Sequence, residues 1–288
     1  MCLASLLPRQ MKIFWKDITA KGRGMVVRMN LQVLAAAVDQ DVKTLAGKMN
    51  LRTEAVIVNQ CDYCGYEEFE HEGSLIRCFF MSERGVGLNR NTALLHATGD
   101  IVLFSDEDIH LYDGYEKTIL DAFERNPHAD LITFNFKVAQ QRSTYYNREN
   151  RPIRWYNYGR YPTFSVAARL EALRKANVSF SLLFGGGARY SNGEDSLFLH
   201  DCLKKGLRLW ACTEEIGEEI YRESTWFKGY NEKFFVDRGV LYHYLYGRAA
   251  KLFSLRFLYA HRAEMCREIP LKRAYGLMKK GIVQGGLR

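Results

Sequence analysis

The sequence predicts an α/β fold whose main sheet is mostly parallel. First, short apolar runs that suit buried strands alternate with helical patterns over residues 31–136, and this alternation is typical of parallel sheets. Second, an apolar run at residues 101–104 is followed almost at once by three acidic residues. Third, 288 residues can bury a substantial core, and no apolar run approaches the ~18 residues that span a bilayer.

The first half of the chain is expected to alternate strands with helices. A strand at residues 31–38 begins the domain because this run is nearly all apolar. The later elements are a helix at 42–49, strands at 54–59 and 75–81, a helix at 89–97 and a strand at 101–104. Gly85 and Gly87 form a turn before the longer helix, and a Gly99-Asp100 turn separates that helix from the last strand.

The second half continues the pattern less regularly. An amphipathic helix is predicted at residues 112–125, where Asn126-Pro127 closes it, and a strand follows at 131–136. Further on, the sequence predicts helices at 166–176 and 196–205 and a strand at 207–211. Residues 141–163, between the strand at 131–136 and the helix at 166–176, are rich in Tyr, Trp and Arg. Such a segment can cover an acceptor site or bind nucleic acid, and composition leaves both open.

The carboxylates that follow the strand at 101–104 predict a metal site. In an open α/β sheet, ligands bind just outside the carboxyl ends of the strands, where Asp106, Glu107 and Asp108 stand. Three acids there repel one another unless a cation is present, and carboxylate oxygens suit a divalent metal. A solvated acidic turn is the alternative, since acidic residues are mostly exposed.

These motifs resemble those of the family 2 glycosyltransferases of the GT-A fold. The match consists, in order, of Gly85, Asn89-Arg90-Asn91, Gly99-Asp100, Asp106-Glu107-Asp108 and Gly193-Glu194-Asp195. The resemblance covers roughly residues 31–240. It implies a Rossmann-like sheet flanked by helices, and an enzyme that moves a sugar from a nucleotide-sugar to a hydroxyl acceptor with inversion.

The resemblance also implies a donor site. It assigns contacts with the nucleotide-sugar to Val38, Asn59, Gln60, Asp62, Arg90, Asp106 and Glu107, and Mn²⁺ or Mg²⁺ binding to Asp106 and Asp108. The second strand of the family usually ends in paired acids and a Ser, whereas this chain has Asn59-Gln60-Cys61-Asp62. The two amides can still pair with the edges of a uracil, so a UDP-sugar is the expected donor.

Arg90 stands at the start of the helix predicted at 89–97. Helix starts favour anions, and an arginine fork suits phosphate oxygens, so we expect this side chain beside the nucleotide. A surface arginine that pairs with Glu83 is the alternative.

Asp195 is the expected general base, because the acceptor hydroxyl must lose a proton as it attacks. We expect Glu194 to orient the site or to stabilise the start of the helix, since acidic residues at a helix start also compensate the helix dipole. Gly186 and Gly187 and the aromatic Trp226 are expected on the acceptor side. Core packing is the alternative for the tryptophan.

Processive members of the family carry Gln-x-x-Arg-Trp near this point and bring transmembrane helices. This chain instead has Arg222-Glu-Ser-Thr-Trp226, and no apolar run in it is long enough for such a helix. We therefore expect a non-processive enzyme that makes single transfers, in the synthesis of a cell-surface polysaccharide or glycoconjugate with a glycan or a lipid-linked acceptor.

The C-terminal part is aromatic and basic. Residues 247–288 contain ten Lys or Arg and two acidic residues, a net charge of +8 that equals that of the whole chain. Such a tail suits an anionic partner and is expected to lie on a membrane surface. The protein is then cytoplasmic and peripheral at the inner face of the plasma membrane. The alternative is a helix that packs its aromatics on the catalytic domain and leaves a solvated basic face.

Four segments are therefore expected. Residues 1–30 are a poorly ordered leader, 31–140 the nucleotide-sugar half of the domain, 141–240 the acceptor half and 241–288 the basic helical tail. Seven cysteines, an odd number without framework spacing, indicate reduced thiols.

Two other classes of protein compete with this interpretation. A nucleic-acid-binding protein could use the basic tail and the aromatics of 141–163, but it leaves the acidic strand end unexplained. A nucleotidyltransferase also places paired acids at a strand end. It would want a Gly-rich loop bearing Lys or Arg after the first strand, where this chain has Val38-Asp-Gln-Asp-Val.

Overall fold

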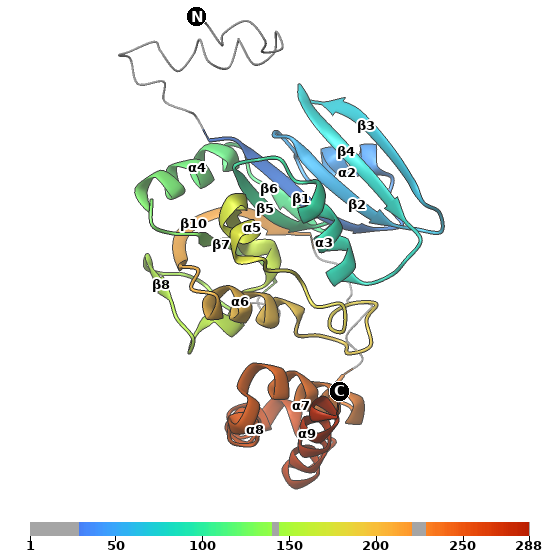
Figure 1. Cartoon of the computed structure of the whole chain (residues 1–288), viewed down its shortest axis with the longest axis vertical. Helices are drawn as coiled ribbons and strands as arrows, with labels where there is room; N and C mark the ends of the chain where they lie inside the picture. The colour runs from blue at the N-terminus through green and yellow to red at the C-terminus, as the bar shows by residue number, and fades with distance from the viewer. Residues whose placement is uncertain (1–28, 140–143, 221–228, 288) are drawn as a thin grey trace, which may run out of the picture.

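The structure is a computed structural model that describes residues 29–139, 144–220 and 229–287. The predicted leader lies almost wholly outside the described residues, and Trp226 lies outside them too. The described chain forms an α/β part and, below it in Figure 1, three C-terminal helices.

Ten strands of the described residues form one sheet at the centre of the α/β part. Its order is β3 (Gly65–His71), β4 (Ser74–Met81), β2 (Ala55–Gln60), β1 (Leu31–Val38), β5 (Ile101–Asp106), β9 (Val166–Arg169), β7 (Leu131–Lys137), β10 (Leu209–Glu219) and β6 (Ile109–Leu111), while β8 (Arg151–Ile153) pairs with β10. The neighbours β4, β2, β1 and β5 are parallel, as are β7 and β10. The predicted mostly parallel sheet is thus confirmed, and the carboxyl ends of β1, β2 and β5 meet at one edge.

The helices of the α/β part cover both faces of this sheet. They are α2 (Val42–Lys48), α3 (Val86–His96), α4 (Tyr115–Arg125), α5 (Leu170–Ala176) and α6 (Glu194–Lys204). In β5, Ile101 and Leu103 belong to one buried cluster, whereas Val102 and Phe104 belong to the other. A strand buried on both faces reads as a continuous apolar run, which explains the pattern seen in the sequence.

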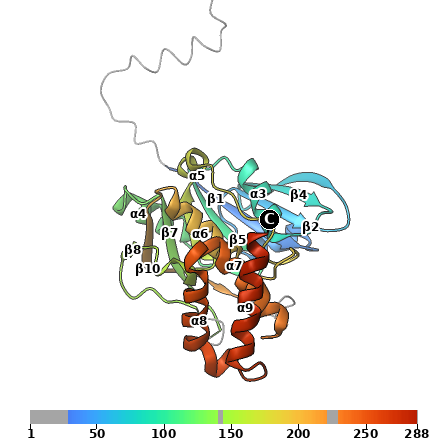
Figure 2. The ribbon, with the colours of Figure 1, turned by 60° about the horizontal axis from the view of Figure 1, so that its bottom comes forward.

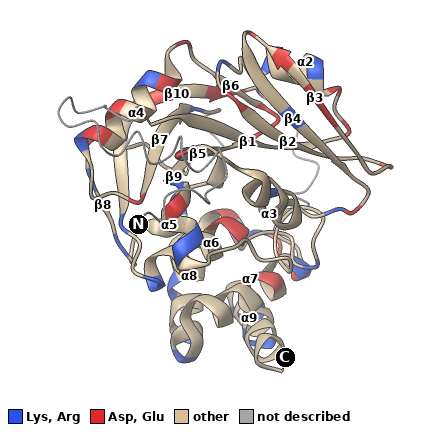
Figure 3. Ribbon diagram, turned by 45° about the horizontal axis from the view of Figure 1, so that its top comes forward, with Lys and Arg blue, Asp and Glu red and all other residues tan. Residues whose placement is uncertain are grey.

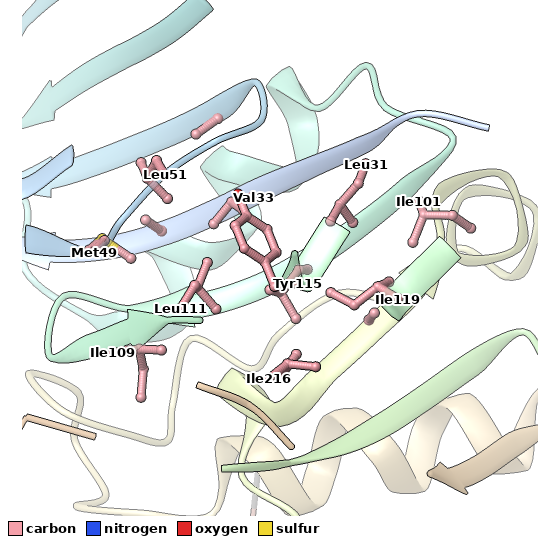
Figure 4. Packing of buried hydrophobic residues seen from close by; sticks show 14 of the residues in the cluster. Leu31, Val33, Met49, Leu51, Ile101, Ile109, Leu111, Tyr115, Ile119 and Ile216 are labelled. Atoms are coloured by element: carbon pink, nitrogen blue, oxygen red, sulfur yellow. The ribbon is translucent and has the colours of Figure 1, made fainter. Parts of the chain in front are cut away.

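Tyr115 of α4 lies at the centre of the first cluster (Figure 4). Figure 4 shows its ring beside Val33 of β1 and Leu111 of β6, and its hydroxyl lies 2.9 Å from the hydroxyl of Thr53. On the opposite face, Phe180 stacks on Phe198 of α6 with ring centroids 4.1 Å apart, and both meet the edge of Phe104. The second cluster therefore ties α6 directly to β5.

The predicted helix at 166–176 was partly wrong. Residues 166–169 form β9, which runs antiparallel to both β5 and β7, and only the remainder is helical. The apolar start of this segment is fully buried between two strands, so pairing in the sheet outweighs its local helical pattern. The edge strand β3 was not predicted, because most of its residues are polar and exposed.

The C-terminal helices are α7 (Glu232–Tyr246), α8 (Ala250–Met265) and α9 (Leu271–Gly286). They share a third buried cluster, which also contains Phe184, Tyr190 and Leu197 from the α/β part. Figure 2 shows α8 and α9 side by side beneath α6. We call these three helices the helical subdomain. The boundary expected after residue 240 falls inside α7, and no helix of the described residues is long and apolar enough to cross a membrane.

Candidate active site

A cavity of about 210 Å³ opens at the carboxyl edge of the sheet. We call it the donor cavity, after the nucleotide-sugar site that the sequence predicts here. Residues from the ends of β1, β2 and β5, from the start of α3, from α6 and from the loop around Gly186 line it. All three residues of the acidic motif, Asp106, Glu107 and Asp108, are among the lining residues. The structure therefore brings the acidic strand end to a cavity, as the sequence predicts.

The three acids of this motif have different surroundings. Asp106 ends β5, and its side chain keeps 30% of its surface exposed. Glu107 is buried, and its Oε2 accepts a hydrogen bond of 2.6 Å from the backbone N–H of Val38. The backbone carbonyl of Asp108 accepts from Ile220 N at 2.7 Å. Glu107 thus holds the end of β1 in place, while Asp106 offers a carboxylate to the donor cavity.

Arg90 is buried and lies among three carboxylates. Its guanidinium nitrogens are 2.9 Å from Asp106 Oδ1, 3.1 Å from Asp195 Oδ1 and 3.6 Å from Glu194 Oε1. The guanidinium also lies over the ring of Phe180, 5.5 Å from its centroid. The alternative of a surface arginine paired with Glu83 was wrong, because this side chain links the acidic strand end to the start of α6.

The two acids at the start of α6 are held differently. Asp195 Oδ1 also accepts a hydrogen bond of 2.5 Å from Thr163 Oγ1, so two donors fix this oxygen. Glu194 lines the donor cavity, and its side chain is only 13% exposed. Burial, together with the negative charge of Asp195, raises the pKa of Glu194 to about 7, although Arg90 acts in the opposite direction. A carboxyl group there can hold a proton near neutral pH.

The residues expected to contact the base have roles within the protein. The side-chain amide of Asn59 donates to Gln40 O at 2.7 Å and accepts from Gln40 N at 3.1 Å. The Gln60 amide donates to the carbonyls of Glu83 and Gly85. Both are buried, so these amide groups position the loops that follow β1 and β4. Gln60 also lines the donor cavity.

Asp62 lies at the surface beside an arginine that the sequence did not single out. Arg84 donates to Asp62 Oδ1 at 2.9 Å and to Asp39 Oδ2 at 3.1 Å, and so bridges the ends of β1 and β2. Thr163 was missed as well, and it precedes β9 in a short 3₁₀ turn without any recognisable motif. Only the tertiary fold brings Thr163 to Asp195, and Arg84 to Asp39 and Asp62.

The three consecutive glycines Gly185, Gly186 and Gly187 pack closely against other parts of the protein. The carbonyl of Gly186 accepts a hydrogen bond of 2.9 Å from Val86 N at the start of α3. At Gly185, where φ is +104°, a Cβ atom would lie 2.5 Å from Val86 Cγ1 and 2.9 Å from Glu194 Cδ. Side chains are therefore excluded where this loop packs against α3 and α6. An acceptor-side role for Gly186 and Gly187 stays a prediction.

The donor cavity has ligands suited to a divalent cation that arrives with a diphosphate. In the described ranges, no group of three or more His, Cys, Asp or Glu could hold a metal alone. Mg²⁺, however, is commonly bound by one or two carboxylates together with substrate phosphates, and Asp106 and Asp108 line the same space. Within the part of the chain that is described, the buried Oδ1 of Asn89 in this cavity has no hydrogen-bond partner. The residues thus fit a polar ligand with a metal.

The described cysteines do not add a metal site. Cys61, Cys64, Cys78, Cys202, Cys212 and Cys266 are all free thiols. The thiol of Cys61 is buried and donates to Tyr63 O, while that of Cys64 lies 3.2 Å from Ser82 Oγ. The C-x-x-C pair is therefore engaged in local contacts.

Comparisons with known proteins agree with this geometry. The model of Glycosyl transferase family 2 matches residues 32–179. The crystal structure of residues 1–349 of S. aureus TarS in complex with UDP-GlcNAc is similar, with a TM-score of 0.58 and 16% identity over 89% of this chain and 81% of that one. The complex with UDP has a TM-score of 0.55 and 16% identity, over 83% and 74% respectively. No relative is found among curated protein sequences.

Proposed function

The chain belongs to glycosyl transferase family 2, and from this premise we propose that it transfers a sugar from a UDP-sugar to a hydroxyl acceptor with inversion of the anomeric carbon. The observation that carries the proposal is the cluster that Arg90 forms with three carboxylates. Arg90, Asp106 and Glu194 line the donor cavity, and Asp195 contacts Arg90 beside it. One of the similar TarS structures is a complex with UDP-GlcNAc and another is a complex with UDP, which supports the choice of donor.

In this proposal, the donor's diphosphate lies at the carboxyl end of β5. Asp106 and Asp108 would hold Mn²⁺ or Mg²⁺, which would neutralise the charge that develops on the leaving diphosphate. Arg90 keeps the Asp106 carboxylate oriented, and Glu107 fixes the end of β1 through the Val38 amide. The chain's own contribution is thus a pre-arranged set of oxygen ligands.

Asp195 removes the proton of the acceptor hydroxyl in the same proposal. General-base catalysis requires a carboxylate held within hydrogen-bond distance of the attacking hydroxyl. Thr163 and Arg90 both contact one carboxylate oxygen and so fix its orientation. Attack from the face opposite the diphosphate inverts the configuration and needs no carboxylate nucleophile. Glu194, adjacent in sequence, keeps the donor cavity polar and supports Arg90.

We further propose that the enzyme works at an anionic membrane surface on the cytoplasmic side, in the synthesis of a cell-surface glycan. Leu252, Leu255 and Tyr259 are exposed and follow one another at helical spacing along α8. Basic residues recur along α8 and α9 (Figure 3). An exposed apolar stripe flanked by basic residues is typical of helices that lie on anionic membranes.

The proposed function is tested with a panel of nucleotide-sugars. Purified protein is incubated with each donor and Mn²⁺ or Mg²⁺, and release of the nucleoside diphosphate is followed without acceptor and with candidate glycans. We expect slow hydrolysis of UDP-sugars that depends on the metal ion. Binding of RNA or DNA in place of any nucleotide-sugar would favour the nucleic-acid-binding alternative instead.

A further inference from the structure

A second cavity, of about 320 Å³, lies between the α/β part and the helical subdomain. It shares no lining residue with the donor cavity. The segment at residues 155–160 forms one wall, and residues of α7 and α8 form the other. We call it the interface cavity.

The first turn of α6 contributes one residue to each cavity. Glu194 lines the donor cavity and Ser196 lines the interface cavity, with Asp195 between them in the sequence. A hydroxyl that loses its proton to Asp195 must belong to a molecule seated beside this turn. The interface cavity is therefore placed to hold the acceptor.

Among the described residues, the permanent charges that line the interface cavity are all positive. Arg160, Arg238 and Arg256 line it together with His261, and no described Asp or Glu does. Arg160, Arg256 and His261 are exposed, so an incoming ligand can reach them. Two exposed aromatic side chains, Trp155 at 68% and Tyr156 at 70%, stand at the same cavity and offer faces for a sugar ring.

Arg238 is the cation that most needs a partner. Its guanidinium lies between the rings of Phe234 and Phe257, 5.3 Å and 5.2 Å from their centroids. Its Nε is buried and has no hydrogen-bond acceptor among the described residues. The Arg238 side chain also forms no ion pair with any described residue. A half-buried guanidinium that forms no ion pair with the described residues is costly, and an anion bound in the cavity would supply a close counter-charge.

We propose that the interface cavity binds a phosphate group carried by the acceptor saccharide. Arginine forks match phosphate oxygens through paired, charge-assisted hydrogen bonds, and the exposed aromatics would hold the sugar beside the phosphate. Its role as the acceptor site rests on the proposed function, because only that function makes Asp195 a base. The phosphate ester can belong to a soluble saccharide or to a lipid-linked one, and both present the same oxygens.

Glucose 6-phosphate and glucose form a matched pair of probes. Their binding to the full chain is measured by ligand-observed NMR, with and without UDP, and inorganic phosphate serves as competitor. We expect the ester to bind at least about tenfold more tightly than glucose, and phosphate to displace it. Arg256→Gln and Arg160→Gln alter exposed side chains and should each weaken ester binding by about tenfold. Arg262→Gln removes the same charge from α8 outside the cavity and should leave binding unchanged.

A second arm uses vesicles of phosphatidylglycerol or phosphatidylcholine. If Arg256→Gln lowers binding to the anionic vesicles alone and leaves the soluble ester unaffected, the cavity binds a lipid head group and not the phosphate of a saccharide, which would overturn the proposal. Equal binding of glucose and its phosphate ester, with every variant unchanged in both arms, would overturn the proposal. Failure of UDP-sugar hydrolysis by the wild-type protein would count against the proposed function and not against the phosphate site, which is measured without donor.

Discussion

Asp195 is the residue on which the proposed chemistry depends most. Its Oδ1 contacts Thr163 and Arg90, while Glu194 beside it faces the donor cavity. A base acts during transfer, so its loss should affect the chemical step more than donor binding. We expect Asp195→Asn to lower kcat by ~10²–10⁴-fold and to leave the affinity for UDP little changed.

Glu194→Gln is the matched comparison for this variant, because it removes the neighbouring carboxylate from the same helical turn. We expect it to lower turnover less. Steady-state kinetics and UDP binding of both variants decide the assignment. If Glu194→Gln had no measurable turnover while Asp195→Asn kept nearly normal turnover, the role of base would belong to Glu194.

The raised pKa of Glu194 also makes the stability of the fold depend on pH. Between the ordinary value of 4.5 and about 7, the folded protein holds a proton that the unfolded chain has lost. The free energy of unfolding is therefore largest below this window and decreases as the pH rises through it. Urea denaturation at about pH 5 and about pH 8 should show a smaller decrease in Glu194→Gln than in wild type, by at most a few kcal/mol. An identical pH dependence in both proteins would contradict the raised pKa.

Individual site residues were predicted where a motif marked them. The strand-end acids and the acidic pair of α6 stand in recognisable local patterns, and the fold brings them to one cavity or beside it. Thr163 and Arg84 carry no such signal, because their contacts depend on segments far away in the sequence. The amides of Asn59 and Gln60 bind backbone groups, and their contact with the base stays a prediction.

At the scale of elements, α7 and α9 pack unusually closely. A Cβ atom at Gly239 would lie 2.1 Å from the Met278 carbonyl oxygen, and one at Gly281 would lie 2.0 Å from that of Val236. Glycine at both positions lets the two helix backbones touch. This contact brings the side chains of α7 and α9 together in the third buried cluster.

Gly239→Ala should therefore destabilise the helical subdomain. The added methyl group meets backbone atoms that cannot move aside, and such overpacking typically costs about 1–3 kcal/mol. Gly276→Ala on α9 is the control, because a Cβ atom there meets nothing within 4 Å. It should stabilise the helix by roughly 0.5–1 kcal/mol. Thermal unfolding of the two variants should shift in opposite directions; a shift of the same sign in both would contradict the close packing.

Elements with a strong local pattern were also the ones predicted best. The strand β5 and the helix α4 have apolar patterns that match their burial. The segment 166–176 was misassigned at its start, since its apolar residues suit either a buried strand or a helix and the sheet decides between them. The three-residue strand β6 is too short to leave a periodic pattern.

For the whole molecule, the exposed apolar face of α8 is the feature that indicates binding to a membrane surface. Leu252 is 69% exposed and Leu255 is 46% exposed. The double variant Leu252→Gln and Leu255→Gln should reduce sedimentation with anionic vesicles severalfold, because apolar burial and charge attraction act together. Leu95→Gln, which alters a 75% exposed leucine of α3 in the α/β part, is the control. Equal sedimentation of both variants would remove the membrane face from the proposal.

The fold class followed from the alternation of strands and helices, whereas the arrangement of the C-terminal part did not. The sequence left open whether the aromatic tail packs on the catalytic domain. In the structure its aromatics join Phe184 and Tyr190 in one cluster, while the basic residues remain largely at the surface. The interface cavity exists only because of this packing, so no local pattern could have predicted it.

The central claim is that the donor cavity binds a nucleoside diphosphate with a metal ion through Asp106 and Asp108. Isothermal titration of UDP into the protein, with and without Mn²⁺, tests it most directly. Wild type should bind UDP much more tightly when Mn²⁺ is present, and Asp108→Ala should lose this dependence while its thermal unfolding stays normal. Asp113→Ala, an exposed acid outside the cavity, should behave as wild type. An Asp108→Ala variant that binds UDP and Mn²⁺ as tightly as wild type would place the donor site elsewhere.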